Sequence, residues 1–200
     1  MRQVLQLLYD FCFEQAAKAA KEAGFTYVAM GFGSSGCFHG EDWEKHLTAI
    51  DKTLTQNGLI CVQTHLPYYP LTVSAEETDT VMDRAMLRCM EAGKKLGASR
   101  HVYHPRTAVN DNYSPRASLR YAKEAVKPLA EAAEKTGTVL CLENLPIFPD
   151  IHTMRFFTSD YEDLAELCDC FSPEAVRVCW DFGHANLMNN NQEKAIATMG

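Results

Sequence analysis

The stretch VLCLENLP, Val139 to Pro146, is an apolar run that reaches a carboxylate, Glu143. Runs of consecutive apolar residues are typical of strands that are buried on both faces of a parallel sheet. Burying a carboxylate without a partner is costly, so a charge at the end of such a strand indicates a compensating cation or hydrogen-bond network. The stretch therefore predicts a buried strand with a functional group at its carboxyl end.

Working outward, short apolar runs alternate with longer segments of helical period. The predicted strands cover residues 2–8, 26–32, 59–65, 99–104, 138–144 and 175–184. The predicted helices cover residues 12–24, 41–58, 75–97, 114–137 and 159–171, and residues 191–200 begin another. Ser159 or Asp160 is the expected N-cap of its helix. Six strand-then-helix units without hairpin signals predict an α/β fold with a parallel sheet covered on both faces.

Two architectures satisfy this alternation, an open doubly wound sheet and a closed barrel. The glycine-rich stretch GFGSSG, residues 31–36, follows the second predicted strand without opening a clear helix, and no GxGxxG follows the first strand. This pattern argues against a dinucleotide-binding fold.

The composition is that of a globular protein, with 200 residues, 46% hydrophobic and 22% charged. We expect a single domain over residues 1–200. The net charge of −7 disfavours a nucleic-acid partner. Eight cysteines without a CxxC pair predict reduced, mostly buried thiols, and the start MRQVLQLLYD is too short an apolar stretch for a signal peptide or a membrane span. We therefore expect a cytoplasmic protein with no membrane association.

Polar residues stand at the carboxyl ends of successive predicted strands, namely His65, His104, Glu143 and Asp181, with His184 just beyond. In a barrel these ends converge on one face, where enzymes of that fold keep their active sites. Converging histidines and carboxylates form either a metal site or an acid–base site. A single histidine at a strand end is more often a hydrogen-bonded structural residue, so the signal lies in the set.

Four motifs carry a resemblance to a known family: LCLEN (140–144), VCWDFGHA (178–185), THLPY (64–68) and VYHPR (102–106). They resemble the strand-end motifs of the xylose isomerase-like TIM barrels. That superfamily holds sugar and sugar-phosphate isomerases and epimerases together with the endonuclease IV type of DNA repair enzyme. The resemblance runs over essentially the whole chain and implies a (β/α)8 TIM barrel, of which about six βα units are present.

The resemblance also implies a site. Glu143 and Asp181 would be ligands of a divalent metal, and His184 matches a position that touches the substrate or a further metal, so Glu143 and His184 are the catalytic candidates. Mn²⁺, Mg²⁺, Co²⁺ and Zn²⁺ all suit such ligands. Arg106, just past His104, is a candidate partner for an anionic group. The expected substrate-binding residues are His65, His104, Asn144, Tyr68 and Arg106.

The function that follows is a metal-dependent isomerase or epimerase acting on a sugar or sugar phosphate. Moving a proton at the carbon beside a carbonyl needs a cation that polarises the oxygens and a base near that carbon. Two alternatives remain open: an abasic-site DNA repair endonuclease with a trinuclear zinc site, and a catalytically inactive fragment.

A complete barrel has eight strands in roughly 250 residues, whereas six are predicted here. In the family, a histidine from the seventh strand and a glutamate from the eighth complete the metal shell. We expect either a truncated sequence or a partner chain that supplies the missing part. Open sheet edges are prone to self-association, which makes a homo-oligomer an expectation.

Overall fold

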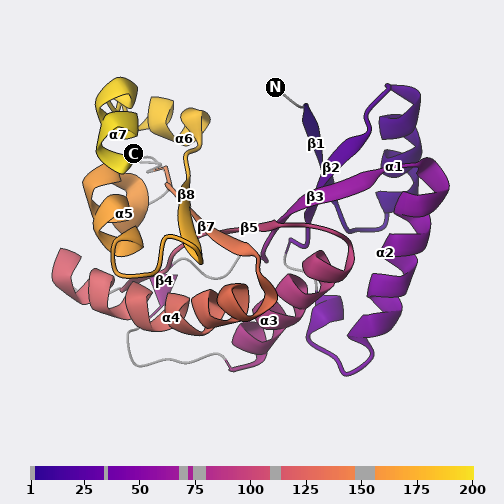
Figure 1. Cartoon of the computed structure of the whole chain (residues 1–200), viewed down its shortest axis with the longest axis horizontal. Helices are drawn as coiled ribbons and strands as arrows, with labels where there is room; N and C mark the ends of the chain where they lie inside the picture. The colour runs from indigo at the N-terminus through magenta and orange to yellow at the C-terminus, as the bar shows by residue number, and fades with distance from the viewer. Residues whose placement is uncertain (1–2, 34–35, 68–71, 74–79, 109–113, 147–155) are drawn as a thin grey trace. The chain divides into compact units, whose positions relative to one another are not determined.

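The computed structural model describes residues 3–33, 36–67, 72–73, 80–108, 114–146 and 156–200 (Figure 1). The chain divides into two compact units. The N-terminal unit comprises residues 1–68, 79–102 and 136–138, and the C-terminal unit comprises residues 69–78, 103–135 and 139–200. Each unit is described by itself.

The N-terminal unit is built on parallel strands in the order β1-β2-β3-β5, which is also their order along the chain. Its strands are β1 (Val4–Leu8), β2 (Tyr27–Gly31), β3 (Ile60–His65) and β5 (Arg100–Tyr103, whose last residue belongs to the other unit). Its helices are α1 (Phe13–Glu22), η1 (Gly36–Phe38), α2 (Trp43–Asn57) and α3 (Thr80–Lys95). The alternation of strand and helix is the one that the sequence predicts.

The C-terminal unit contains the parallel pair β7 (Val139–Glu143) and β8 (Val176–Cys179), whose register ends with Glu143 opposite Cys179. A second, two-residue parallel pair joins β4 (Thr72–Val73) to β6 (Thr107–Ala108). The helices are α4 (Pro115–Thr136), η2 (Phe157–Ser159), α5 (Tyr161–Cys168), α6 (Phe182–Leu187) and α7 (Gln192–Met199). All strand pairs described in both units are parallel.

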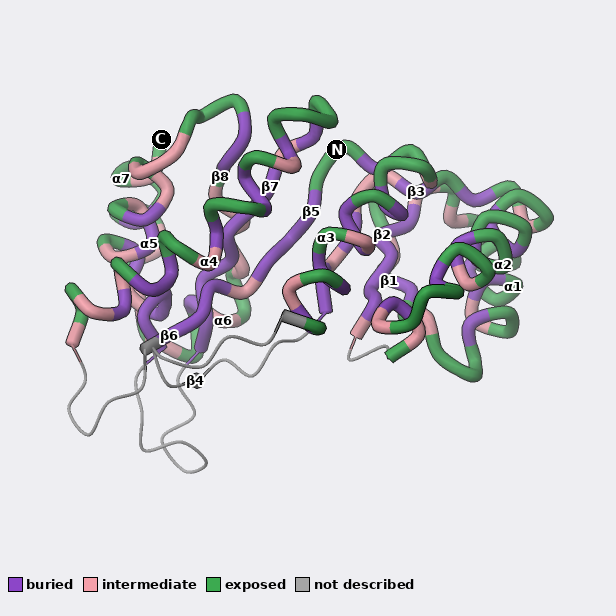
Figure 2. The backbone as a smooth tube through the Cα atoms, turned by 90° about the horizontal axis from the view of Figure 1, so that it is seen from below, coloured by how far each residue is buried: buried purple, intermediate pink, exposed green. Residues whose placement is uncertain are grey.

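The core follows from the helical and strand periodicities. Helix α1 buries Phe13, Ala17 and Ala20, which lie on one face of the helix. Helix α2 ends at Gly58, whose φ of +65° is left-handed and suits a residue without a Cβ. Figure 2 shows buried residues along the strands and exposed residues on the outward faces of the helices. Burial of these apolar stripes is the main contribution that stabilises each unit.

The predicted strands are confirmed, each one or two residues shorter at one or both ends, with one larger difference. The predicted strand over 175–184 ends at Cys179, and helix α6 begins at Phe182. Asp181 explains the change, because its side chain caps α6 by accepting a hydrogen bond from the backbone N–H of His184. The expected cap at Asp160 is confirmed, since Asp160 accepts from the backbone N–H of Glu162 at 3.0 Å.

The short elements β4, β6, η1 and η2 carry no periodic signal in the sequence, because each is only two or three residues long. The predicted helix over 75–97 is found as α3 from Thr80, and residues 75–79 lie outside the described part of the chain. Within the described residues, the helices are too short or too polar to cross a membrane.

Candidate metal centre at the carboxyl ends of β7 and β8

Glu143 is the last residue of β7 and is 6% exposed. Leu140, Cys141 and Leu142 of the same strand are also buried. The apolar run therefore forms an interior strand, as the sequence predicts. The hydroxyl of Thr158 donates to the backbone carbonyl of Glu143 at 3.2 Å. The strand end is therefore held in place, and the carboxylate lies in an environment where an ionised group needs partners.

Two histidines flank the Glu143 carboxylate. The Nε2 of His104 lies 3.1 Å from Oε2 of Glu143, at donor distance, and the His104 side chain is 10% exposed. The Nδ1 of His184 lies 3.5 Å from Oε1. The two imidazole rings are arranged edge to face, with centroids 6.4 Å apart. The His104 N–H offsets part of the cost of burying the carboxylate.

Asp181 occupies the turn between β8 and α6. Its Oδ1 accepts a hydrogen bond from the backbone N–H of His184 at 2.8 Å, while its Oδ2 lies 3.9 Å from Nδ1 of the same residue. The Asp181 side chain is partly exposed. One carboxylate oxygen thus caps the helix, and Asp181 also offers a possible ligand atom within 4.8 Å of those of Glu143 and His184.

His184 is held in one tautomer. Its Nδ1 lies 2.8 Å from the backbone carbonyl oxygen of Asn144, and because a carbonyl can only accept, Nδ1 carries the proton. The neutral ring then has its lone pair on Nε2. That nitrogen can accept a proton or bind a substrate hydroxyl.

The residues present fit a divalent cation. Glu143, Asp181 and His184 each offer an atom that could bind a cation, and these atoms lie within 4.8 Å of one another. Because Nδ1 of His184 donates to the Asn144 carbonyl, the two carboxylates are the better ligands and Nε2 of His184 is left for proton transfer. Two carboxylates at this separation, one of them buried, create a concentration of negative charge that a divalent cation would relieve. Carboxylate-rich donors favour Mn²⁺, Mg²⁺ or Co²⁺, and a histidine shifts the preference toward Zn²⁺.

A thiol stands beside this group but does not join it. Cys179 lies opposite Glu143 in the strand register, and burial, followed by the charge of Glu143, raises the pKa of the Cys179 thiol to about 12. Among the described residues, the group of possible ligand atoms within 4.8 Å contains Glu143, Asp181 and His184 and does not contain Cys179. The chemistry of the site rests on carboxylates and imidazoles.

The C-terminal unit brings together five of the predicted site residues, which are His104, Glu143, Asn144, Asp181 and His184. Asn144 is 1% exposed and both ends of its carboxamide bond to the backbone of Asp181. Its expected role in substrate binding stays a prediction.

The other predicted substrate-binding residues lie elsewhere. His65 is the last residue of β3 in the N-terminal unit, where its Nδ1 donates to the carbonyl oxygen of Leu66 at 2.9 Å. Arg106 is buried in the C-terminal unit, 4% exposed, with Nη1 3.4 Å from the hydroxyl of Tyr121. Tyr68 lies outside the described residues.

Thr158 is a site residue that the sequence reasoning missed. It is fully buried in η2, where its hydroxyl binds the Glu143 carbonyl and its own carbonyl accepts from the backbone N–H of Leu145 at 3.2 Å. Nothing in the local sequence marks it, because it follows no strand and belongs to a three-residue element.

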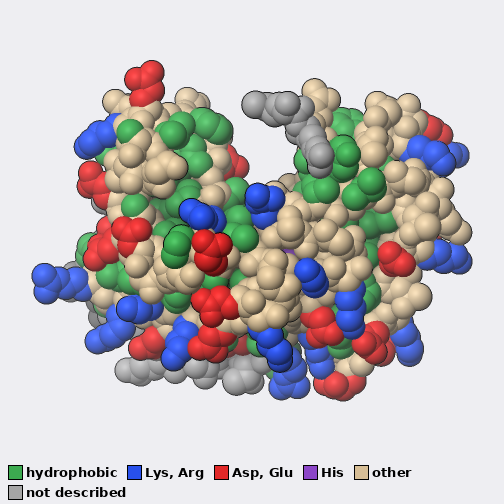
Figure 3. Space-filling view, viewed as in Figure 1, with side chains coloured by type: hydrophobic (Ala, Val, Ile, Leu, Met, Phe, Trp, Pro, Cys, Tyr) green, Lys and Arg blue, Asp and Glu red, His purple; other side chains and the backbone are tan. Residues whose placement is uncertain are grey.

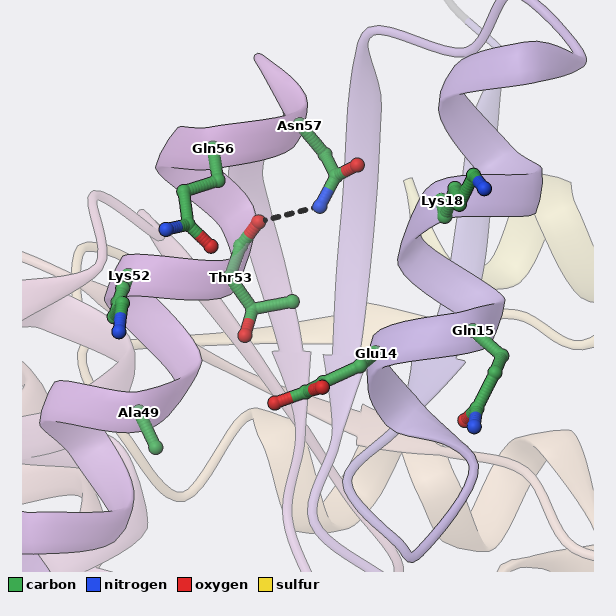
Figure 4. Close-up of a pocket in the computed structure, with 8 residues that line it drawn as sticks. All are labelled: Glu14, Gln15, Lys18, Ala49, Lys52, Thr53, Gln56 and Asn57. Atoms are coloured by element: carbon green, nitrogen blue, oxygen red, sulfur yellow. Dashed lines mark hydrogen bonds between the residues drawn. The ribbon is translucent and has the colours of Figure 1, made fainter.

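A groove of about 580 Å³ lies between α1 and α2 in the N-terminal unit (Figure 4). Figure 4 shows Glu14 reaching between the helices, and the Asn57 side chain donating to the Thr53 carbonyl of its own helix. The lining residues are Glu14, Gln15, Lys18, Ala49, Lys52, Thr53, Gln56 and Asn57. None of these residues belongs to the predicted site, so this groove is not the candidate active site.

Comparison with known proteins identifies the family. A family model described as "Xylose isomerase-like TIM barrel" matches residues 17–200. The chain belongs to the xylose isomerase-like TIM barrel family. The expected fold class and family are thereby confirmed. No curated protein sequence matches the chain.

Solved structures of this fold align with the whole chain. A D-tagatose 3-epimerase-like protein has a TM-score of 0.76 and 17% identity, and the alignment covers 100% of this chain and 71% of that one. An AP endonuclease, family 2, from Brucella melitensis has a TM-score of 0.73, 16% identity and coverage of 100% and 76%. The 3-keto-D-glucoside 4-epimerase from E. coli has a TM-score of 0.73, 15% identity and coverage of 100% and 75%. At these identities the likeness establishes the xylose isomerase-like barrel fold.

Proposed function

We propose that this chain is a divalent-metal-dependent isomerase or epimerase that acts on a sugar or sugar phosphate. The observation that carries the proposal is the grouping of Glu143, Asp181 and His184, with ligand atoms within 4.8 Å of one another. Membership of the xylose isomerase-like family and the likeness to structures described as 3- and 4-epimerases support the same reading.

In this proposal Glu143 and Asp181 hold the cation, which when bound supplies polarisation of the carbonyl and hydroxyl oxygens of the substrate. Glu143 also serves as the base that removes the proton from the carbon beside the carbonyl. His104, 3.1 Å from Oε2, keeps the Glu143 carboxyl group in one orientation while the proton moves. The buried position of Glu143 limits the access of water to the base.

His184 moves a proton at the substrate oxygen. Because Nδ1 donates to the Asn144 carbonyl, Nε2 is free of its proton and can accept one from a hydroxyl group, then return it. Of the predicted substrate-binding residues, His104 and Arg106 belong to the same unit as this group, and we propose that they supply the remaining substrate contacts. Arg106 would favour an anionic substituent such as a phosphate.

Metal content of the purified chain is the first test. We expect about one Mn, Co, Mg or Zn per chain by elemental analysis, and loss of that metal in Asp181→Asn, which keeps an oxygen for the α6 cap. Asn191→Ala is the matched control, because Asn191 caps α7 in the same way without belonging to the site. A wild-type chain that binds no divalent metal contradicts the proposal.

The reaction class has its own test. Incubating the metal-loaded chain with ketohexoses, aldoses and their phosphates in D₂O should exchange one carbon-bound proton next to the carbonyl, detected by NMR. A stoichiometry near three zincs, with cleavage of an abasic DNA duplex and no sugar exchange, would instead establish the repair endonuclease. The likeness to the Brucella AP endonuclease makes that control necessary.

A further inference from the structure

Asn144 directly follows the carboxylate Glu143 and is almost completely buried. Its Oδ1 accepts a hydrogen bond from the backbone N–H of Asp181 at 2.6 Å, and its Nδ2 donates to the backbone carbonyl of Asp181 at 3.0 Å. A carboxamide presents the same donor and acceptor as a peptide group. The side chain therefore extends the parallel ladder beyond its last pair, Glu143 and Cys179.

The backbone of Asn144 makes a second contact with the site. Its carbonyl oxygen accepts from Nδ1 of His184 at 2.8 Å, which sets the ring orientation and leaves the lone pair on Nε2. Asn144 thus contacts Asp181 through its side chain and His184 through its backbone. It is covalently joined to the third member of the group, Glu143.

We propose that Asn144 is the positioning residue of this site, which fixes Asp181 and His184 relative to Glu143. The inference rests on the proposed function for its chemical consequence. Metal-site partners that orient ligands through hydrogen bonds have large effects on metal affinity although they touch no metal. Because both ends of the carboxamide are already bonded inside the protein, Asn144 acts on the substrate through its neighbours.

The chemistry of the contact requires an asparagine. Aspartate has nearly the same shape but no N–H, so it would lose the donor to the Asp181 carbonyl and place a third negative charge near Glu143 and Asp181. Alanine lacks both groups and leaves a buried backbone N–H and carbonyl unpaired, which is costly. Glutamine keeps both groups on a chain that is one methylene longer.

The test measures Mn²⁺ affinity by titration calorimetry on the full chain and on Asn144→Asp and Asn144→Ala. We expect affinity to fall about 10- to 100-fold in both variants. Asn190→Asp is the matched control, because Asn190 makes the same amide-to-carbonyl bond, to Ser159 at 3.3 Å, in the same unit. Because Asn190 orients none of the proposed metal ligands, the Mn²⁺ affinity of Asn190→Asp should stay within about twofold of the wild-type value.

A second readout needs no metal. In the metal-free wild type, the Asp181 amide should be protected from hydrogen exchange and His184 should show the Nδ1–H tautomer by ¹⁵N NMR. In Asn144→Ala, with circular dichroism of wild-type shape, Asp181 protection should be lost. If Asn144→Ala fails to fold, Asn144→Asp decides the question, because it retains the shape of the side chain.

The outcomes separate the two proposals. Wild-type Mn²⁺ affinity in Asn144→Asp, or a loss equal to that of Asn190→Asp, overturns the positioning role. So does an Asp181 amide that stays protected in folded Asn144→Ala. A wild-type chain that binds none of Mn²⁺, Mg²⁺, Co²⁺ and Zn²⁺ refutes the proposed function alone. Hydrogen exchange at the Asp181 amide and the tautomer of His184 then decide the role of Asn144.

Discussion

At the scale of single residues, Glu143 explains why an apolar strand ends in a charge. The side chain is buried, and the His104 N–H at 3.1 Å supplies one compensating hydrogen bond. A hydrogen bond to a charged group contributes about 1.5–3 kcal/mol and so offsets part of the several kcal/mol that burying an ion costs. A divalent cation held by Glu143 and Asp181, as proposed above, would compensate this charge further.

Replacing Glu143 with Gln tests whether the charge of Glu143 is needed to bind a metal. The variant keeps an oxygen that can accept a hydrogen bond from His104 but loses the negative charge. We expect Mn²⁺ affinity to fall by more than about 100-fold, which exceeds the loss typical of residues that only orient a metal ligand. The fold should be retained, because a buried charge is removed. Calorimetric titration and thermal melting check both points, and unchanged metal affinity would show that Glu143 is not a ligand.

His101 is a buried histidine with a structural role in the N-terminal unit. It is fully buried on β5, its Nδ1 lies 2.7 Å from the hydroxyl of Thr64, and burial, followed by the charge of Lys94, lowers its pKa from 6.5 to about 4. The folded chain therefore keeps His101 neutral in mildly acidic solution, where the unfolded chain protonates it.

His101 consequently predicts a loss of stability in acid. Between pH 6.5 and 4 the unfolded state binds more protons, so the free energy of unfolding falls as the pH falls through that window. From pH 7 to pH 5 this residue should cost about 2 kcal/mol. Urea unfolding at both pH values measures it. His101→Asn, which keeps a partner for Thr64 without the titration, should show a flatter profile; an equally steep one would refute the assignment.

At the scale of elements, helix α3 contacts β3 and β5 closely at one glycine. A Cβ added at Gly93 would lie 2.7 Å from Cγ2 of Thr64 and 2.9 Å from Cε1 of His101. Real carbon atoms do not approach so closely, and both neighbours are fully buried. Glycine is unfavourable inside a helix by about 1 kcal/mol relative to alanine, so its presence here indicates that the close approach of helix and strand dominates.

Gly93→Ala should therefore destabilise the protein, despite the better helix propensity of alanine. The expected net change in the free energy of unfolding is about 1–3 kcal/mol, the range typical of overpacking. Urea denaturation monitored by circular dichroism measures it. Gly36→Ala is the control, because a Cβ there meets nothing within 4 Å, and a Gly93→Ala variant as stable as that control would contradict the packing argument.

The backbone between η1 and α2 is held by one arginine. The guanidinium of Arg88 on α3 donates to the carbonyls of Phe38, His39 and Gly40 at 3.2, 2.9 and 2.9 Å and to the carboxylate of Glu41 at 2.8 Å. The Arg88 side chain is only 12% exposed. An arginine has five N–H donors and can satisfy several loop carbonyls at once, so residues 38–41 are held by a structural contact.

At the scale of the whole molecule, the eight cysteines form no disulfide. Cys61, Cys89 and Cys141 are buried, Cys12 is exposed, and the other four are half-buried, which is fewer buried thiols than the sequence predicts. Burial raises the pKa of Cys61 to about 11 and, with nearby negative charge, that of Cys168 to about 12. Cys61 and Cys168 are therefore protonated near neutral pH.

This distribution predicts a graded reaction with a thiol reagent. In Ellman's assay at pH 8, Cys12 should react first, Cys61 and Cys89 should react slowest, and all eight should react after denaturation in guanidinium. Mass spectrometry of partially labelled protein assigns the order. Rapid labelling of Cys61 or Cys89 in the folded chain would contradict their burial.

The charge of the molecule also bears on its partners. Acidic and basic side chains are interspersed over the face shown in Figure 3, and the total is −7. Nucleic-acid binding rests mainly on clustered lysine and arginine, so the sequence-based expectation of a small-molecule substrate stays the preferred prediction.

The sequence by itself determined the order of strands and helices and marked Glu143 and Asp181 as strand-end carboxylates. These features are local, since the periods of apolar residues and the capping residues lie within one segment. Even so, the sequence extended β8 through Asp181 and His184, because the apolar residues of VCWDFGH hid the helix that Asp181 caps.

Only the tertiary structure decided which polar groups meet. Asn144 bonds to Asp181 across 37 positions, and His104 bonds to Glu143 across 39. Such contacts depend on the register between β7 and β8 and on how the segments after the strands fold back, and register is a property of paired strands. A pattern within one segment cannot specify the register between two strands. The hydrogen bonds of Asn144 to Asp181 and of Thr158 to Glu143 are therefore visible only in the tertiary structure.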